Sequence, residues 1–377
     1  MDSHIVLVTG GSGFLGQHVV KHLDMFCDDI TEIRVLDIRP YKKNLGVQIV
    51  SDNIFCFVYI KLLDGFVVDF EDRKPVTSII GNLIDPDVVR KACKNVKCVF
   101  HIGALVEYKL FPDITALNEI NILGTQNVIN ACKEEGVENL IYCGSISSFF
   151  DGHEVLEGTE ETVPIAKNPL GEYAVSKKVA LEMVIKENGS VLENGKILQT
   201  AAVLPTSMYG EEDRRRLEVA SFYKEGTVSR VVGKTTALLP LVYVGNVAMM
   251  FVKVYERMRR DTGIGGHYFF TADNTPPQTA FESGHIYIPK ENVKINLSYW
   301  YIPMFATMTM VTLLYYILLP IRPFYKVNLP ISNWVILHMN KTCLYKNDKA
   351  KKMLGYEPLY DYATALKKTK AFFGTVR

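Results

Sequence analysis

Three residues in the middle of the chain are of types that could together move a proton to or from a substrate oxygen. Tyr173 and Lys177 are four residues apart, so on a helix they share one face. A nearby ammonium lowers the pKa of a phenol, which suits Tyr173 to acid–base chemistry near neutral pH. Ser145 follows the apolar run 140–143 and could hydrogen-bond the same oxygen, although Ser147 and Ser148 compete for that role.

The first residues of the chain supply the second chemical feature, a glycine-rich turn. Four apolar residues at 5–8 predict a buried strand, and glycines follow at 10, 13 and 16 before a helical pattern begins. A turn without side chains lets the backbone approach a pyrophosphate, and the helix N-terminus points N–H groups at it. The sequence therefore predicts dinucleotide binding by Gly10, Gly13, Phe14, Leu15 and Gly16.

An acidic residue at the end of the next apolar run supports this prediction. Asp37 follows the run 33–36, about 20 residues past the glycines, where a carboxylate can hold a ribose hydroxyl. Asp37 favours NAD over NADP because it would repel a 2′-phosphate, and Arg39 weakens that preference. Taken alone, Tyr173 and Lys177 would be interpreted as a surface tyrosine beside a solvated lysine. Their position after a dinucleotide turn favours catalysis.

The bulk composition excludes several classes of partner. The chain has 377 residues, with 42 Lys+Arg against 41 Asp+Glu, so we expect no nucleic-acid partner. The seven cysteines are an odd number and form no CxxC pair, which indicates a reducing compartment and argues against a zinc site. We predict no metal.

Strand and helix patterns alternate along the first 200 residues. This alternation predicts an α/β fold with a doubly wound parallel sheet of the Rossmann type. We place a dinucleotide-binding domain at 1–200 and a smaller substrate-binding region at 201–377. Residues 41–75 are longer than a crossover requires, and we interpret them as an atypical insertion. They are either an added hairpin or sequence that does not belong to the mature product.

Several motifs resemble those of one enzyme family. The segment TGGSGFLG at 9–16, the YxxxK at 173–177 and the serine turn resemble the extended short-chain dehydrogenase/reductases. Within that group, VYVGNVA at 242–248 and LGYEP at 354–358 are similar to segments of the 3β-hydroxysteroid dehydrogenase/Δ5–Δ4 isomerase family. The resemblance covers most of the chain, excluding 41–75 and thinning over 278–340.

The resemblance implies roles for individual residues. The cofactor-binding residues it implies are Gly10, Gly13, Phe14, Leu15, Gly16, Asp37, Asn82, Gly103, Ala104, Lys177 and Pro205. Tyr173 would be the base for a 3β-hydroxyl, Lys177 would tune it, and Ser145 would polarise the carbonyl. Asn121 matches an asparagine associated with proton relay, so the catalytic residues implied are Tyr173, Lys177, Ser145 and Asn121.

Some positions depart from the family's pattern. Cys143-Gly144 replace a Thr-Ser pair before the catalytic serine, and Leu204 and Leu241 replace arginines. Losing these basic residues would alter substrate or cofactor affinity without touching the proton chemistry. Asn274 stands where some members have a second acid, which leaves isomerase activity open.

The segment 295–321 carries no charged side chain and is long enough to span a bilayer. The alternative is a buried helix of the substrate region. If the LGYEP tail packs back on the enzyme domain, both ends of the segment lie on one side of the membrane. Our hypothesis is that the segment lies in one leaflet or on its surface. We expect the endoplasmic reticulum membrane, with the catalytic domain facing the cytosol.

Together these features predict NAD-dependent oxidation of the 3β-hydroxyl of a sterol or steroid to the 3-ketone, with Δ5 to Δ4 isomerisation as an open second step. The nearest rival is a decarboxylating sterol-4α-carboxylate 3-dehydrogenase, against which the VYVGNVA segment argues. A nucleotide-sugar epimerase and a non-catalytic NAD-binding membrane scaffold are further candidates. The resemblance also implies a homodimer through the helices that include Tyr173.

Overall fold

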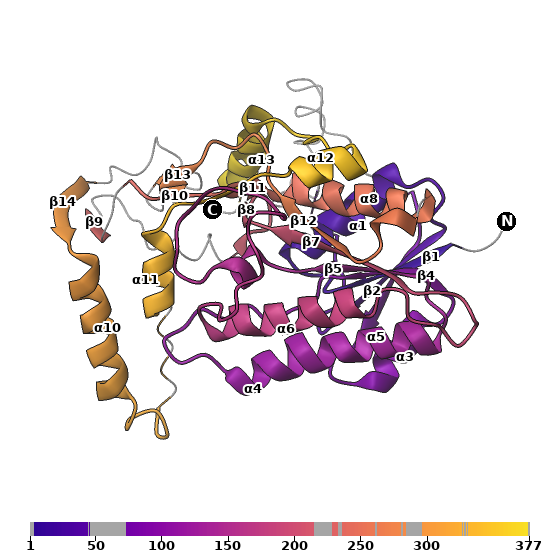
Figure 1. Ribbon diagram of the computed structural model, residues 1–377, viewed down its shortest axis with the longest axis horizontal. Helices are drawn as coiled ribbons and strands as arrows, with labels where there is room; N and C mark the ends of the chain where they lie inside the picture. Colours follow the sequence, from indigo (N-terminus) through magenta and orange to yellow (C-terminus); the bar gives the residue numbers. More distant parts are fainter. Residues whose placement is uncertain are drawn as a thin grey trace, which may run out of the picture.

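A seven-stranded parallel sheet forms the centre of the fold (Figure 1). The computed structural model describes residues 4–43, 45, 73–214, 228–232, 236–260, 262–279, 282–283, 296–325, 327, 329 and 331–375. The sheet order is β12-β7-β5-β4-β1-β2-β3, so the winding direction reverses between β1 and β4. The predicted α/β fold with a doubly wound sheet is confirmed, and its ligand crevice is expected at that reversal. The strands are β1 Ile5–Thr9, β2 Glu32–Asp37, β3 Val76–Ile80, β4 Val96–His101, β5 Asn139–Cys143, β7 Gln199–Pro205 and β12 His267–Thr271.

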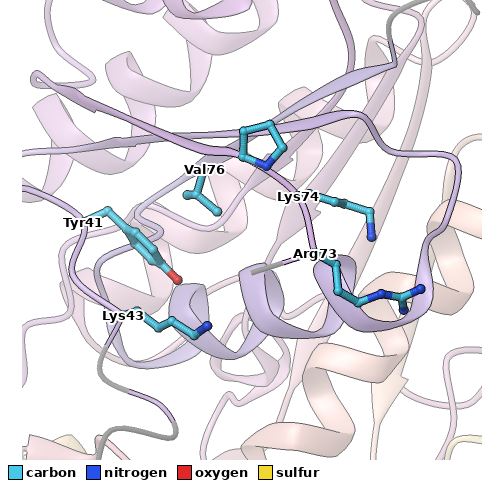
Figure 2. A pocket seen from close by; sticks show the side chains of 6 residues that line it. Tyr41, Lys43, Arg73, Lys74 and Val76 are labelled. Carbon is cyan, nitrogen blue, oxygen red and sulfur yellow. The ribbon is translucent and has the colours of Figure 1, made fainter. Parts of the chain in front are cut away.

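The connection between β2 and β3 contains the insertion proposed at 41–75. Residues 44 and 46–72 lie outside the described part of the chain, so both interpretations of this segment stay predictions. A cavity of about 450 Å³ lies where the chain leaves and re-enters the described part, lined by Tyr41, Lys43, Arg73, Lys74, Pro75 and Val76 (Figure 2). Because Val76 is the first residue of β3, this cavity lies toward the amino end of the strand, away from the glycine turn.

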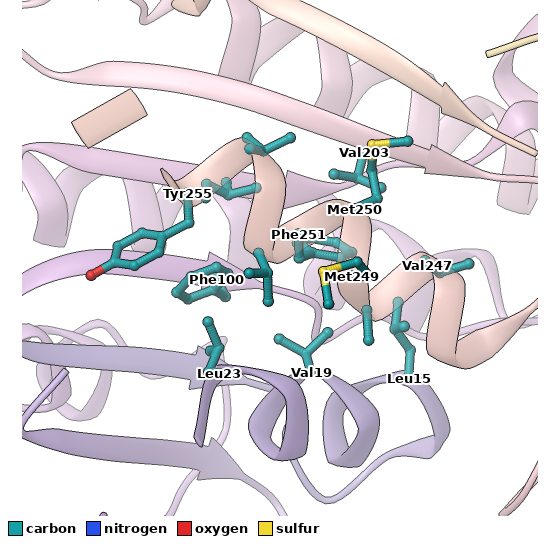
Figure 3. Close-up of a cluster of buried hydrophobic side chains, with 14 of the residues drawn as sticks. Leu15, Val19, Leu23, Phe100, Val203, Val247, Met249, Met250, Phe251 and Tyr255 are labelled. Carbon is teal, nitrogen blue, oxygen red and sulfur yellow. The ribbon is translucent and has the colours of Figure 1, made fainter. Parts of the chain in front are cut away.

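Two hydrophobic clusters cover the two faces of the sheet. Alternate residues of β1 point to opposite faces: Val6 and Val8 join one cluster, and Ile5 and Leu7 the other. The first cluster packs α1 (Phe14–Phe26) and α8 (Val244–Arg260) against the sheet, as Figure 3 shows. On the opposite face lie α3 (Pro86–Cys93), α5 (Gly124–Glu134) and α6 (Glu172–Lys186) (Figure 1).

Residues on both sides of position 200 build the sheet. The strand β7 begins at Gln199, and β12 joins β7 in parallel from far along the chain. The VYVGNVA segment spans β11 (Leu241–Tyr243) and the start of α8, and its residues are buried. Near the C-terminus, α12 (Asp348–Leu354) and α13 (Tyr362–Thr375) complete the first cluster. The sheet therefore draws elements from both predicted regions.

The remaining elements connect these layers. They are α4 Ile114–Leu117, the π-helix η1 Asn118–Leu123, η2 Ile146–Phe149, β6 Val155–Gly158, β8 Ser207–Tyr209, β9 Val228–Val232, β10 Leu238–Leu239, η3 Thr262–Ile264, β13 Gln278–Thr279, β14 Asn296–Ile302, α10 Met304–Leu318, α11 Asn333–Met339 and β15 Cys343–Tyr345. Helices α10 and α11 lie side by side at the left of Figure 1.

Most of the predicted apolar segment 295–321 forms β14 and α10, and α10 has 15 residues. Within the part of the chain that the structure describes, no helix combines the length and apolar character needed to cross a membrane. One side of α10 packs in a third hydrophobic cluster that includes Leu110, Phe111, Val311 and Ile336.

Candidate active site

The glycine turn lies where β1 and β4 separate. Gly10 has φ +70°, and a Cβ there would lie 2.6 Å from Gly103 Cα. A Cβ on Gly16 would overlap the carbonyl oxygen of Gly10. Both positions therefore require glycine, because the backbones of the turn, of α1 and of the segment after β4 meet there. Without side chains at these two positions, the backbone of the turn permits a close approach by a ligand.

The N-terminus of α1 is suited to an anion. Gly13 is its N-cap, no side chain caps the helix, and its first turn contains no acidic residue. The N–H groups of this turn have no intrahelical acceptor, and the helix dipole places partial positive charge beside them. Phe14 and Leu15 begin the helix at this position. These features fit the pyrophosphate of a dinucleotide.

Asp37 is fixed beside the glycine turn. Its Oδ2 accepts a hydrogen bond from Ser12 N at 3.1 Å, and its Oδ1 accepts one from Arg39 N at 3.0 Å. The Arg39 Nε atom lies 3.8 Å from Asp37 Oδ1, but the Arg39 side chain is largely exposed. The carboxylate is therefore held at the end of β2, where the ribose contact is predicted. Asn82 lies in the turn after β3, and its Oδ1 accepts from Ile84 N at 3.3 Å.

Lys177 is buried at the carboxyl end of β5. Its Nζ donates to the carbonyl oxygen of Cys143 at 2.7 Å and lies 4.3 Å from the centre of the Tyr142 ring. Burial lowers the pKa of Lys177 to about 8. Tyr173 lies one turn earlier on α6, on the same helix face, and its side chain is also buried. The fold therefore brings the YxxxK pair to the strand that leads to Ser145.

Ser145 caps the short helix η2 that follows β5. Its Oγ accepts hydrogen bonds from Ser147 N at 3.2 Å and from Ser147 Oγ at 2.8 Å. Since both of these contacts use Ser145 as an acceptor, its own hydroxyl hydrogen can be donated to a substrate oxygen. Ser148, the other competing serine, is fully buried. The arrangement favours Ser145 over Ser147 and Ser148.

Two departures from the family's pattern contact each other. A Cβ on Gly144 would overlap the Cδ2 atom of Leu204, which lies on the neighbouring strand β7. Gly144 also donates its N–H to the carbonyl oxygen of Val203 at 2.9 Å. The glycine before Ser145 therefore accommodates the leucine that replaces the expected arginine. Pro205 ends β7 directly after Leu204 and pairs in register with Thr271 of β12.

A buried chain of polar groups runs from the glycine turn toward α6, and sequence analysis did not identify it. Thr125 Oγ1 donates to the carbonyl oxygen of Asn121 at 2.6 Å, so His101 Nε2, 3.0 Å away, is the donor to Thr125. His101 Nδ1 then accepts from Thr9 Oγ1 at 2.8 Å. Burial lowers the pKa of His101 to about 3, which keeps the ring neutral. This chain assigns the tautomer of His101.

The side chain of Asn121 continues this network to α6. Asn121 Nδ2 donates to Ser176 Oγ at 2.9 Å, and Ser176 Oγ donates to the carbonyl oxygen of Tyr173 at 2.8 Å. Asn121 also exchanges hydrogen bonds with the backbone of Leu105, at 2.8 and 2.9 Å. It lies in the π-helix η1, a form often found at functional sites. The network thus links the cofactor turn to Tyr173.

Asp273, next to Asn274, is committed to the protein's own backbone and side chains. Its carboxylate accepts hydrogen bonds from Tyr243 N and Asn246 Nδ2, both at 2.8 Å, and from Thr275 N at 2.9 Å. Asn274 is exposed. Asp273 therefore anchors the VYVGNVA segment.

Comparison with known families completes the description of the site. The model of the 3-beta hydroxysteroid dehydrogenase/isomerase family matches residues 7–286. The chain belongs to this family. The resemblance stated from the motifs is thereby confirmed, while the roles of the individual site residues stay predictions.

Solved structures share the fold across almost the whole chain. A complex of MoeE5 with UDP-glucuronic acid and NAD is 17% identical, with 97% of this chain and 98% of that chain covered and a TM-score of 0.65. A UDP-galactose 4-epimerase is 15% identical, with 98% of each chain covered and a TM-score of 0.65. The dTDP-glucose 4,6-dehydratase DesIV from Streptomyces venezuelae, with NAD and TYD bound, is 16% identical, with 99% and 98% covered and a TM-score of 0.63.

Proposed function

We propose that this protein oxidises the 3β-hydroxyl of a sterol or steroid to the 3-ketone. It is a dehydrogenase-type enzyme, and its cofactor is NAD. The observation that carries the proposal is the placement of Lys177, which lies one helical turn after Tyr173. Its buried ammonium donates a hydrogen bond to the carbonyl oxygen of Cys143, and Cys143 lies two residues before Ser145. Membership of the 3-beta hydroxysteroid dehydrogenase/isomerase family supports the steroid substrate.

The chain's own residues divide the work of the reaction. When bound, NAD supplies the hydride acceptor. The glycine turn and the α1 N-terminus hold the pyrophosphate, and Asp37 holds a ribose. As C3 loses its hydride, Tyr173 takes the proton of the hydroxyl group, and Ser145 donates a hydrogen bond to the substrate oxygen. With a pKa of about 8, the Lys177 ammonium is charged at neutral pH and stabilises the phenolate of Tyr173.

We propose that the segment 271–276 does not catalyse the isomerisation step. Moving a proton along a Δ5 double bond needs a group that can release and accept it. In this segment the carboxylate of Asp273 accepts three hydrogen bonds from the protein, and Asn274 is an amide, which does not titrate. If the proton could move only through this segment, the product would be the Δ5-3-ketone, which lacks the ultraviolet absorbance of the conjugated Δ4 isomer.

Turnover with a panel of 3β-hydroxysteroids tests the proposal. We expect NADH absorbance to rise with NAD and a 3β-hydroxysteroid, and not with the 3α epimer. Tyr173→Phe should reduce kcat by about 100-fold or more, because it removes the proton acceptor, while calorimetry still detects NAD binding. Turnover of Tyr173→Phe at the wild-type rate, or no turnover of any 3β-alcohol by the wild type, would refute the proposal.

We also propose that the outer face of α10 lies in one leaflet of the endoplasmic reticulum membrane, with the catalytic domain facing the cytosol. Large apolar side chains are exposed along this face: Phe305, Met310, Leu313, Tyr316 and Ile317 are 58–73% exposed. A sterol partitions into lipid, so an enzyme on the membrane surface meets its substrate there.

Liposome flotation tests whether the outer face of α10 binds a membrane. Leu313→Glu/Ile317→Glu should release the protein from the vesicles, because two charges would enter the apolar boundary. Leu156→Glu is the control, since Leu156 is similarly exposed, at 65%, but lies on β6. Flotation of the double variant with the wild type would contradict the proposal, as would protection of a C-terminal tag from protease in the lumen.

A further inference from the structure

Two aromatic side chains form a continuous ring contact with the predicted base. The ring of Tyr108 meets that of Tyr173 edge to face, with centroids 5.3 Å apart. The indole of Trp334 meets Tyr108 in the same way, at 5.0 Å. Tyr108 follows β4, and Trp334 lies in the first turn of α11, so elements far apart in sequence converge on Tyr173.

Trp334 also contacts the start of the catalytic helix directly. A Cβ on Gly171, the N-cap of α6, would lie 2.8 Å from the indole Nε1 of Trp334. Gly171 has φ +91°, so both its backbone conformation and the indole exclude a larger residue. The indole therefore lies against the backbone two residues before Tyr173.

The loop that carries Tyr108 and the two helices form one packed unit, which we call the α10–α11 unit. Phe111 stacks on Tyr315 of α10 with centroids 4.8 Å apart, and Leu110 N donates to Leu329 O at 2.9 Å. Asn333 Nδ2 of α11 donates to Thr312 Oγ1 of α10 at 2.7 Å. This unit joins the exposed apolar face of α10 to the rings beside Tyr173.

The residues beside Tyr108 and two positions where the resemblance places arginines suit an uncharged substrate. Glu107 and Lys109, on either side of Tyr108, pair with each other at 3.2 Å. Leu204 and Leu241, at the positions where the resemblance places arginines, are buried apolar side chains. A substrate with a diphosphate would find no arginine at either position, whereas an apolar ring system can pack on aromatic faces.

We propose that Tyr108 and Trp334 form an aromatic wall that holds the apolar ring system of the substrate against Tyr173. The wall makes the enzyme specific for polycyclic alcohols over small ones. This inference rests on the proposed oxidation by Tyr173 and names the residues that select its substrate. Because the rings lie on the α10–α11 unit, a substrate leaving the lipid along α10 reaches the wall before it reaches the base.

Kinetics with two alcohols test the wall. A four-ring 3β-hydroxysteroid and a bicyclic secondary alcohol offer the same carbinol, but the bicyclic alcohol has half of the ring system. Trp334→Ala should raise KM for the steroid about tenfold, because aromatic contact area is lost. The kcat/KM for the bicyclic alcohol should stay within about twofold, and Trp334→Phe should restore most of the steroid KM.

Tyr316→Ala is the matched control, since it removes an exposed aromatic ring of the same unit. In detergent it should leave KM and kcat/KM unchanged for both alcohols. Equal losses on both alcohols in Trp334→Ala would overturn the proposal, because Trp334 would then only support the position of Tyr173. An unchanged steroid KM would overturn it as well.

Fluorescence separates failure of the wall from failure of the proposed function. The chain has two tryptophans, Trp300 and Trp334, so Trp300→Phe leaves Trp334 as the only indole emitter. In a Trp300→Phe/Tyr173→Phe protein with NAD, turnover should be slow enough for binding to be measured, and a bound steroid should quench Trp334. Steroid binding seen by calorimetry without a change in emission would overturn the wall, and so would an absence of steroid binding. Failure of wild-type turnover alone would reject the oxidation.

Discussion

The cofactor side of the site and the α10–α11 unit are built from different kinds of contact. On the cofactor side, glycine backbones touch, and directional hydrogen bonds link β1 to α6 through the chain Thr9–His101–Thr125–Asn121. On the other side, Tyr108 and Trp334 reach Tyr173 through ring edges and faces. Directional bonds fix atoms for hydride transfer, whereas ring contacts provide area for an apolar body and tolerate adjustment. Substitutions on the cofactor side should therefore lower NAD affinity or stability more than substitutions in the α10–α11 unit do.

The largest effect is expected at the glycine turn. Gly10→Ala places a Cβ 2.6 Å from Gly103 Cα at a positive φ, so two backbones must move apart. We expect NAD affinity to fall by about 100-fold or more, since the turn can no longer approach the pyrophosphate. Isothermal calorimetry with NAD measures this change.

Gly189→Ala is the matched control for backbone strain. Gly189 also has a positive φ, +86°, but its added Cβ meets nothing within 4 Å. It should lower the free energy of unfolding by about 1–2 kcal/mol through strain alone and leave NAD affinity unchanged. If the two variants bind NAD equally well, the close packing at Gly10 does not matter for the cofactor.

A smaller effect is expected for His101→Leu, which interrupts the polar chain. Thr9 Oγ1 loses the acceptor of its hydroxyl hydrogen in a buried place, so the free energy of unfolding should fall by about 1–3 kcal/mol at pH 7. Thr125→Ser is the control, because it keeps the hydroxyl group. Urea denaturation measures both, and equal stability of His101→Leu and wild type would show that the chain contributes nothing.

The same variant should change the acid sensitivity of the protein. Burial lowers the pKa values of His18, His22 and His101 to about 3 in the folded state, below the ordinary 6.5. Between these values the unfolded chain binds protons that the folded chain does not, so stability is complete above pH 6.5 and is lost as the pH falls. His101→Leu should make this loss shallower, by up to about 1.4 kcal/mol per pH unit. An identical slope would contradict the burial of a neutral His101.

An effect of similar size is expected where Gly144 and Leu204, the two departures from the family's pattern, meet. Gly144→Ala should destabilise the protein by about 1–3 kcal/mol, because its Cβ overlaps Leu204 Cδ2. Leu204→Ala makes room, so the double variant should lose less stability than the sum of the single variants. Thermal unfolding of the four proteins measures this coupling. Additive losses would mean that the overlap at position 144 is relieved elsewhere.

The cofactor side could be predicted from sequence because its signals are local. The glycines at 10, 13 and 16 lie in the turn after β1 and the first turn of α1, Asp37 ends β2, and the YxxxK lies on α6, while their roles stay predictions. His101 gave a weaker signal, a lone polar residue in an apolar run. Its partners Thr9 and Thr125 lie 92 and 24 residues away, so no spacing rule could connect them.

The α10–α11 unit could not be predicted for the same reason. The contact between Tyr108 and Trp334 depends on how two distant segments pack, and neither segment carries a motif. Hydropathy identified 295–321 as one apolar stretch but could not show that it divides into β14 and a helix of 15 residues. The fold class followed from alternating patterns, whereas this division depends on tertiary contacts.

The first helix, α1, contacts a residue close to the C-terminal end of the chain. His22 of α1 and the hydroxyl of Tyr360, 338 positions later, are 3.3 Å apart in a hydrogen bond, and α13 lies beyond it. During synthesis the ribosome releases residues in order, so α10 emerges while Tyr360 is still untranslated. The nascent chain therefore exposes the apolar face of α10 before the contact between His22 and Tyr360 can form.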